Sequence, residues 1–125
     1  MTDAEALFID TNILIYANVV TAPLHEQALN AIKRAHQTGR PLWISRQVLR
    51  EFIATRTRPQ TFAQPSAPQV VIERVRYLEE RFQVADDTNI VATMLAHDIP
   101  CLLTHNVKDF ERFKEVIRIE EIDSD

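Results

Sequence analysis

Residues 6–16 read ALFIDTNILIY, a short apolar run followed by Asp10, Thr11 and Asn12 and then by a second apolar run. The first run has the length of a buried strand, and weak helical spacing over 12–20 follows it. The stretch therefore predicts a strand that leads into a helix, with a carboxylate at the junction. Burying these two elements does not by itself require an acid there, so Asp10 is a candidate functional residue.

The rest of the chain repeats this alternation of strand and helix. Gly39 is expected to end the helix over 24–38, and 57–69 is expected to be irregular because it contains three prolines. Further strands are predicted at 41–45, 82–85, 101–104 and 116–122, and further helices around 48–53, after 69, over 88–97 and over 107–113. The pattern predicts one domain over 1–125, a three-layer α/β/α sandwich with a mostly parallel central sheet.

Composition excludes several classes of protein. No apolar run approaches the roughly 20 residues that span a bilayer, and the acidic N-terminus is unlike a signal peptide, so we expect no membrane association. A single cysteine, Cys101, excludes an internal disulfide framework and fits the reducing cytoplasm. A single glycine excludes a glycine-rich phosphate loop.

Charge is unevenly distributed along a chain of net charge −4. Four of the last six residues are acidic, whereas the segment 46–58 has one acid, Glu51, among four arginines. These arginines either contact the phosphates of a nucleic acid or form a solvated helix face. They are Arg46, Arg50, Arg56 and Arg58.

Acidic and amide side chains follow the predicted strands, where a parallel sheet collects its ligands. Oxygen ligands from separate segments, without the Cys or His spacing of a zinc site, suit Mg²⁺ or Mn²⁺, which commonly serve phosphodiester hydrolysis. The positions are Asp10, Glu51, Asp86 or Asp87, Asn106 and Asp109.

Each position also has a structural interpretation. Asp10 and Asp87 precede helices, where Asp is a favoured N-cap worth about 1 kcal/mol. Glu51 could pair with an arginine on the surface, although its apolar neighbours predict that it is half buried. Asn106 could be a turn residue or a cap, and Asp109 could interact with a helix dipole. Four coincidences at four strand ends are less probable than one site.

Four segments together resemble the PIN-domain ribonucleases, and most closely the VapC-type toxins of bacterial toxin–antitoxin pairs. They occur in the family's order and spacing, and the similarity extends from about residue 7 to about residue 122. They read FIDTNILIYA, SRQVLREFI, DDTNIVATMLAH and LLTHNVKDF. The resemblance implies a Mg²⁺-dependent endoribonuclease, in which Mn²⁺ can substitute, that is inhibited by a small antitoxin protein and often forms homodimers.

The resemblance also implies roles for individual residues. Asp10, Glu51 and Asp87 match the family's metal-binding acids, with Glu51 acting as a ligand or as a base for the attacking water. Thr11 and Asn12 match the polar pair beside the first acid, and would hydrogen-bond the carboxylates or the waters of the metal. Asp86 occupies a neighbouring position that is often His or another residue in the family, so it ranks behind Asp87.

The last motif departs from the family pattern. Many members have a fourth acid two residues after the final Thr of the strand, where this chain has Asn106. Either Asn106 contributes an amide oxygen, or Asp109 reaches the site, directly or through water. The loss of one charge predicts a single tightly bound ion.

Three functions other than RNA cleavage make different demands on the sequence. A degenerate PIN-like module would bind RNA or protein without cleaving it, which Asn106 makes plausible. A phospho-acceptor receiver domain would need an acidic pair after the first strand and a lysine after the fifth, and the chain lacks both. A nuclease for DNA flaps would need additional segments to grip duplex DNA.

Overall fold

The structure is a computed structural model that describes residues 4–86 and 89–122. A single five-stranded sheet in the order β3-β2-β1-β4-β5 forms its centre, and every pair of neighbouring strands is parallel. The strands are β1 (Leu7–Ile9), β2 (Leu42–Ser45), β3 (Gln83–Ala85), β4 (Cys101–Leu103) and β5 (Arg118–Glu120). The predicted α/β class with a parallel sheet is confirmed.

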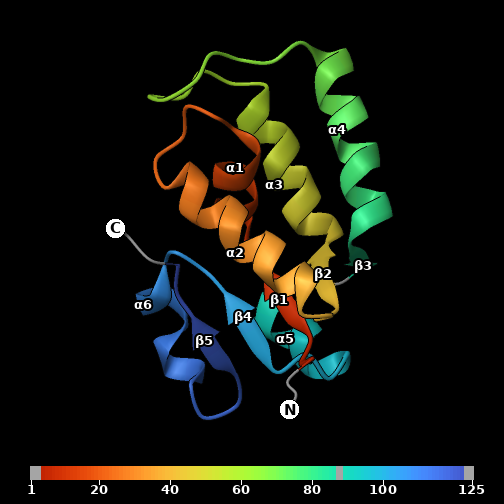
Figure 1. Cartoon of the computed structure of the whole chain (residues 1–125), viewed down its shortest axis with the longest axis vertical. Helices are drawn as coiled ribbons and strands as arrows, with labels where there is room; N and C mark the ends of the chain where they lie inside the picture. The colour runs from red at the N-terminus through yellow and green to blue at the C-terminus, as the bar shows by residue number, and fades with distance from the viewer. Residues whose placement is uncertain (1–3, 87–88, 123–125) are drawn as a thin grey trace.

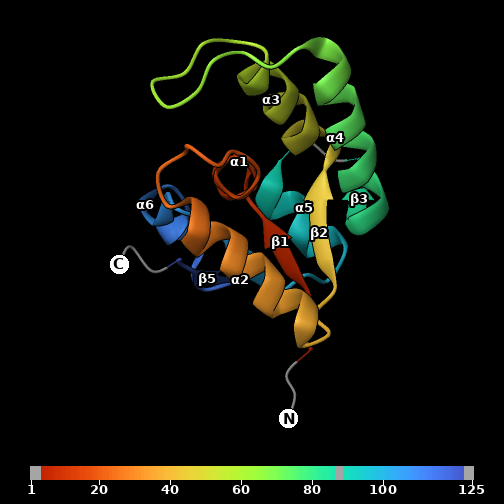
Figure 2. The same ribbon diagram turned by 45° about the horizontal axis from the view of Figure 1, so that its top comes forward.

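Helices connect the strands and cover both faces of the sheet, with α2 in front of it and α5 behind it (Figures 1 and 2). The helices are α1 (Thr11–Asn18), α2 (His25–Gln37), α3 (Arg46–Arg56), α4 (Pro68–Arg81), α5 (Ile90–Ala96) and α6 (Val107–Phe110), followed by a 3-10 turn, η1 (Glu111–Phe113). The chain therefore has the predicted α/β/α layers.

The middle of the sheet is the centre of the apolar core. All three residues of β1 and all three of β4 are buried. On the helical side, Phe52 of α3 and Leu78 of α4 are at most 2% exposed. Burial of a large apolar side chain contributes about 1.5–3 kcal/mol. This apolar packing fixes where β1 and β4 end, and the candidate site begins at those ends.

Three local predictions have different outcomes. Gly39 ends α2 as expected, with a φ of 80° that favours glycine. Pro68 was expected in the irregular segment but is the first residue of α4, a position that tolerates proline because no helical N–H bond is lost there. Ile53 shares the apolar helical spacing of Val48, Leu49 and Phe52, which predicts a buried side chain, but it is 39% exposed.

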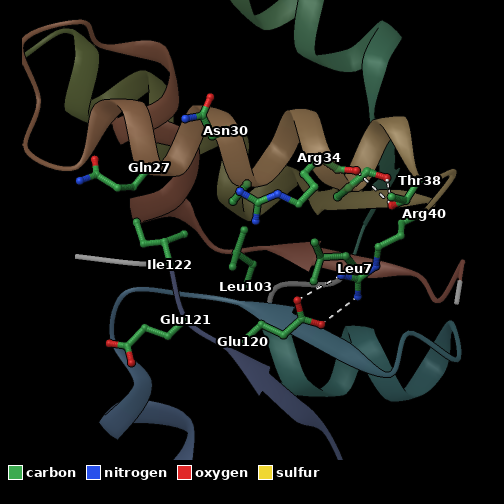
Figure 3. A pocket seen from close by; sticks show the side chains of 12 residues that line it. Leu7, Gln27, Asn30, Arg34, Thr38, Arg40, Leu103, Glu120, Glu121 and Ile122 are labelled. Carbon is green, nitrogen blue, oxygen red and sulfur yellow. Dashed lines mark hydrogen bonds and ion pairs between the residues drawn. The ribbon is translucent and has the colours of Figure 1, made fainter. Parts of the chain in front are cut away.

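A cavity of about 560 Å³ lies between α2 and the edge of the sheet that carries β5 (Figure 3). On its wall, Arg40 donates two hydrogen bonds to the Glu120 carboxylate, of 3.1 and 2.9 Å. These bonds hold the pKa of Glu120 below its ordinary value. The pair joins the residue that precedes β2 to the last strand, and the cavity lies apart from the predicted site.

The strand order reverses direction at β1. The chain moves from β1 to β2 and β3 on one side, then crosses to β4 and β5 on the other. In open parallel sheets, ligands bind beyond the carboxyl ends of the strands at such a point. The carboxyl ends of β1 and β4 are therefore where a site is expected.

Candidate metal and phosphodiester site

Asp10 lies directly after β1 and is the N-cap of α1. Its side chain is almost buried, at 8% exposed, and every oxygen is used. Oδ1 accepts a hydrogen bond from the Thr11 backbone N–H (2.8 Å), and Oδ2 accepts from the Thr104 hydroxyl (2.8 Å) and from Nδ2 of Asn12 (3.4 Å). The helix-cap and functional interpretations are thus compatible, because the same carboxylate also faces the pocket described below.

The charge on Asp10 is unfavourable in this environment. Its pKa is raised above the ordinary value, chiefly because burial removes the carboxylate from water. Hydrogen bonds from Thr104 and Thr11 lower the pKa, while the negative charges of Glu51 and Asp109 raise it further. A cation bound beside Asp10 would therefore stabilise the charged form of its carboxylate.

Glu51 extends from α3 toward the same place. Its Oε1 accepts a hydrogen bond from the Thr11 hydroxyl (2.6 Å), and Oε2 accepts from Nε2 of Gln47 (3.1 Å). The prediction that Glu51 is half buried is wrong: it is exposed, because Val48, Leu49 and Phe52 form the buried face of α3. Thr11 links the first two acids, since its N–H binds Asp10 and its hydroxyl binds Glu51.

The turn after β4 forms the opposite wall. Oδ1 of Asn12 accepts from the backbone N–H of His105 (3.2 Å), and the Thr104 hydroxyl oxygen accepts from the N–H of Asn106 (3.0 Å). Asn106 is exposed at the N-cap position of α6, yet its side chain makes no capping bond. The side-chain amide of Asn106 therefore does not cap α6, although a cap was one of its structural interpretations.

Asp10, Glu51, Asn106 and Asp109 all line one open pocket of about 500 Å³. Asp109 is exposed in the first turn of α6. The remaining lining residues are Thr11, Asn12, Ile15, Ala54, Thr55, Arg58, Ile90 and Phe110. Three carboxylates and an amide from the beginning, middle and end of the chain thus meet, as the strand-end argument predicts.

Of the two acids that follow β3, the structure describes only Asp86. Asp86 is exposed and accepts an ionic hydrogen bond from Nε of Arg46 (2.6 Å). Asp87 lies outside the described residues, so its predicted role as a ligand stays a prediction. The N-cap of α5 is Asn89, whose Oδ1 accepts from the Ala92 N–H (2.9 Å), so the cap interpretation of Asp87 is wrong.

Only one of the four candidate arginines, Arg58, lines this pocket. Arg46 pairs with Asp86, and Arg50 donates to Oε1 of Gln47 (2.9 Å). Arg56 donates to Oγ of Ser66 (2.5 Å), which attaches α3 to the following loop. Of the four, Arg58 is therefore the best placed to meet a phosphate in the pocket.

Two residues of the site were not singled out from the sequence. Thr104 is fully buried, and its hydroxyl connects the Asp10 carboxylate with the backbone of Asn106. Gln47 positions Oε2 of Glu51, the oxygen that does not bind Thr11. A polar residue at the end of the otherwise apolar run CLLT is a signal for the first, whereas nothing in the sequence distinguishes Gln47 from other exposed helix residues.

The donor set fits a hard cation. No group of three or more His, Cys, Asp or Glu side chains that could hold a metal ion is present within 4–86 and 89–122, a range that omits Asp87. Mg²⁺ commonly keeps several waters and uses one or two carboxylates directly. The arrangement of Asp10 with Glu51 and Asp109 in one pocket fits this partly hydrated mode of binding. It does not resemble a cage in which every ligand comes from the protein.

Solved structures of two bacterial complexes resemble this fold. A chain in the crystal structure of VapBC2 from Rickettsia felis bound to a DNA fragment from their promoter aligns with a TM-score of 0.65 at 16% identity, over 94% of this chain and 99% of that one. A chain of DNA-bound VapBC from Salmonella typhimurium aligns with a TM-score of 0.55 at 23% identity, over 94% and 98%.

The chain has the fold of these VapBC chains. The resemblance to VapC-type PIN domains, drawn from the four sequence segments, is thereby confirmed at the level of the fold. No protein-family profile and no curated protein sequence matches the chain. In the described part of the chain, no helix combines the length and the apolar character needed to cross a membrane.

Proposed function

We propose that this protein is a metal-dependent endoribonuclease that hydrolyses phosphodiester bonds in RNA and acts as the toxin of a toxin–antitoxin pair. The observation that carries the proposal is the convergence of Asp10, Glu51 and Asp109 on one pocket at the carboxyl edge of a parallel sheet. The VapBC fold supports the toxin role.

In this proposal, Asp10 would hold Mg²⁺, and Glu51, Asp109 and Asn106 would complete the site. Asp87 is proposed as a second direct ligand. The bound ion, for which Mn²⁺ can substitute, would neutralise charge on the phosphate and lower the pKa of a water molecule.

The protein's own residues would prepare the reaction geometry. Thr11, Asn12 and Thr104 fix the Asp10 carboxylate by hydrogen bonds, so little reorganisation is needed when substrate binds. Glu51 keeps an exposed carboxylate at the pocket and is the candidate proton acceptor. Arg58, on the same wall, is the candidate contact for a phosphate oxygen.

The negative charge of the carboxylate pocket also indicates which partners would bind there. A small antitoxin that places an arginine in the carboxylate pocket would neutralise it and exclude the metal. Single-stranded RNA loops are the expected substrate class, because their bases are unstacked and accessible to an open pocket. The family resemblance further suggests a homodimer, and the unpaired Cys101 is consistent with action in the cytoplasm.

The test is cleavage of a mixed tRNA and rRNA pool by purified protein with Mg²⁺, with Mn²⁺ and with EDTA. Asp10→Asn and Asp87→Asn are each expected to abolish metal-dependent cleavage while the protein stays folded by circular dichroism. Asp98→Asn is the matched control: Asp98 is exposed, precedes β4 at the opposite edge of the sheet, and has a φ of 56° that Asn tolerates. Normal cleavage by Asp10→Asn would refute the site.

A second function is favoured by one observation, the amide of Asn106 at the position of a fourth acid. A non-cleaving PIN-like module would bind RNA or protein through the same pocket. Its signature would be RNA or protein binding measured by calorimetry, without cleavage in any metal.

A further inference from the structure

A third pocket, of about 400 Å³, lies at the other end of α1 from Asp10, between α1, α2 and α4. Its floor is apolar and includes Ala17, Leu29 and Leu78. The rest of its lining includes five basic side chains, so we call it the basic pocket. They are His25, Lys33, His36, Arg74 and Arg81.

The charge of this pocket is one-sided. No carboxylate is among its lining residues, although acidic residues outnumber basic ones in the chain, 18 to 14. Lys33, Arg74 and Arg81 form no ion pair with any described residue. Three permanent positive charges thus surround one hollow without internal compensation, which attracts a polyanion.

Tyr77 holds two of these charges in place. The guanidinium carbons of Arg74 and Arg81 lie 4.9 and 4.7 Å from the centre of its ring. Such stacking restrains a guanidinium at little cost in hydration and leaves its N–H groups free to bind phosphate oxygens in pairs. The two arginines are therefore preorganised donors.

We infer that the basic pocket binds the phosphodiester backbone of an RNA strand, away from the bond that is cut. The inference rests on the proposed function, since it takes the substrate of the carboxylate pocket to be RNA. The volume suits one nucleotide, with its base or sugar on the apolar floor and its phosphate on the arginines.

The position of the basic pocket suits one substrate that spans both sites. Asp10 caps the start of α1, while Ala17 and Asn18 at its end line the basic pocket. The eight residues of α1 separate them by about 12 Å along the helix axis. A strand anchored at the basic pocket would present a neighbouring phosphodiester to the acids.

The experiment measures binding of a fluorescently labelled, unstructured RNA oligonucleotide in EDTA, at several salt concentrations. The variants are Arg74→Gln with Arg81→Gln, compared with Arg76→Gln, which is exposed on the same helix but lines a groove on its other side. All three arginines are exposed, so folding should be preserved. The double variant should bind more weakly, and its salt slope should fall by about 1.4, at about 0.7 for each lost phosphate contact.

The outcomes separate this inference from the proposed function. If the double variant binds with the affinity and salt slope of Arg76→Gln, or if the unchanged protein binds no RNA, the basic pocket is not an RNA anchor. If poly-glutamate competes while RNA binding is unaltered by the variants, the ligand is an acidic peptide and the inference is overturned. If binding falls as expected but no metal supports cleavage, the anchor stands and the ribonuclease proposal fails.

Discussion

Asp10 combines two functions that usually occur at different residues. As an N-cap it satisfies the start of α1, and as a buried acid it faces a pocket with two other carboxylates. The cap needs only an oxygen acceptor, whereas the repulsion from Glu51 and Asp109 acts on the charge. The charge of Asp10 therefore lowers stability in the absence of metal.

The pH dependence of folding should show this cost. Because the folded pKa of Asp10 is raised, the unfolded chain loses its proton first, and stability falls as the pH rises from the unfolded pKa, about 3.8, to the folded pKa. Asp10→Asn removes this loss. The free energy of unfolding, measured in urea with EDTA, should therefore increase for the variant relative to the unchanged protein as the pH rises above 3.8.

A constant difference between the two proteins across that range would contradict the assignment of the raised pKa to Asp10. Added Mg²⁺ should stabilise the unchanged protein more than the variant, because only the former offers the ionised ligand.

Thr104 should matter both for stability and for the site. Thr104→Val keeps the shape of the side chain but removes one of the three hydrogen bonds to the Asp10 carboxylate and the acceptor of the Asn106 N–H, at a cost of about 1–3 kcal/mol in urea unfolding. Thr93→Val is the control, since Thr93 is equally buried and its hydroxyl bonds Asn89 instead. Thr104→Val should reduce RNA cleavage, and Thr93→Val should not.

Among the elements, the end of α2 depends on the backbone conformation of Gly39. Gly39 has a φ of 80°, and a Cβ built there would have no atom within 4 Å. Gly39→Ala should therefore lower the free energy of unfolding by about 1 kcal/mol through backbone strain, without any clash. Gly39→Asn should cost less, because Asn tolerates the left-handed region. Equal thermal midpoints for Gly39→Ala and the unchanged protein would contradict this explanation.

The elements were predictable from the sequence where a local pattern determined them. Short apolar runs identified the strands up to β4, partial alternation identified β5, and Gly39 identified the end of α2. Helix faces were less predictable: Ile53 follows the apolar spacing of α3, but α4 packs beside it and leaves Ile53 in a groove with Val71 and Val75. That arrangement depends on where the loop after α3 returns the chain.

The site was predictable to a similar extent. Asp10, Glu51, Asn106 and Asp109 were identified because each follows a strand and matches a family segment, and the fold brings them together. Thr104 was missed because its role depends on a hydrogen bond between residues 94 positions apart. The exposure of Glu51 was mispredicted because its apolar neighbours in sequence point to a different side of the helix.

At the scale of the whole molecule, the Arg40–Glu120 pair attaches the edge strand β5 to the segment before β2. Because the folded pKa of Glu120 is lowered, the pair stabilises the protein above the unfolded pKa, about 4.5, and this contribution is lost as the pH falls through the folded pKa. Glu120 is 38% exposed, so the contribution is at most about 1 kcal/mol.

Glu120→Gln should therefore lower the thermal midpoint at neutral pH and leave it unchanged in acid. Glu121→Gln is the comparison, because Glu121 is adjacent but forms no ion pair among the described residues. The same loss in both variants would show that overall charge, rather than the pair, is responsible.

The site draws its polar side chains from distant parts of the sequence: Asp10 belongs to the first motif, and Asn106 and Asp109 belong to the last. During synthesis the ribosome releases the N-terminal part first, at about 5–20 residues per second. A growing chain has no complete carboxylate pocket until α6 has emerged and β4 has inserted beside β1. The carboxylate pocket is therefore one of the last parts of this fold to be completed during synthesis.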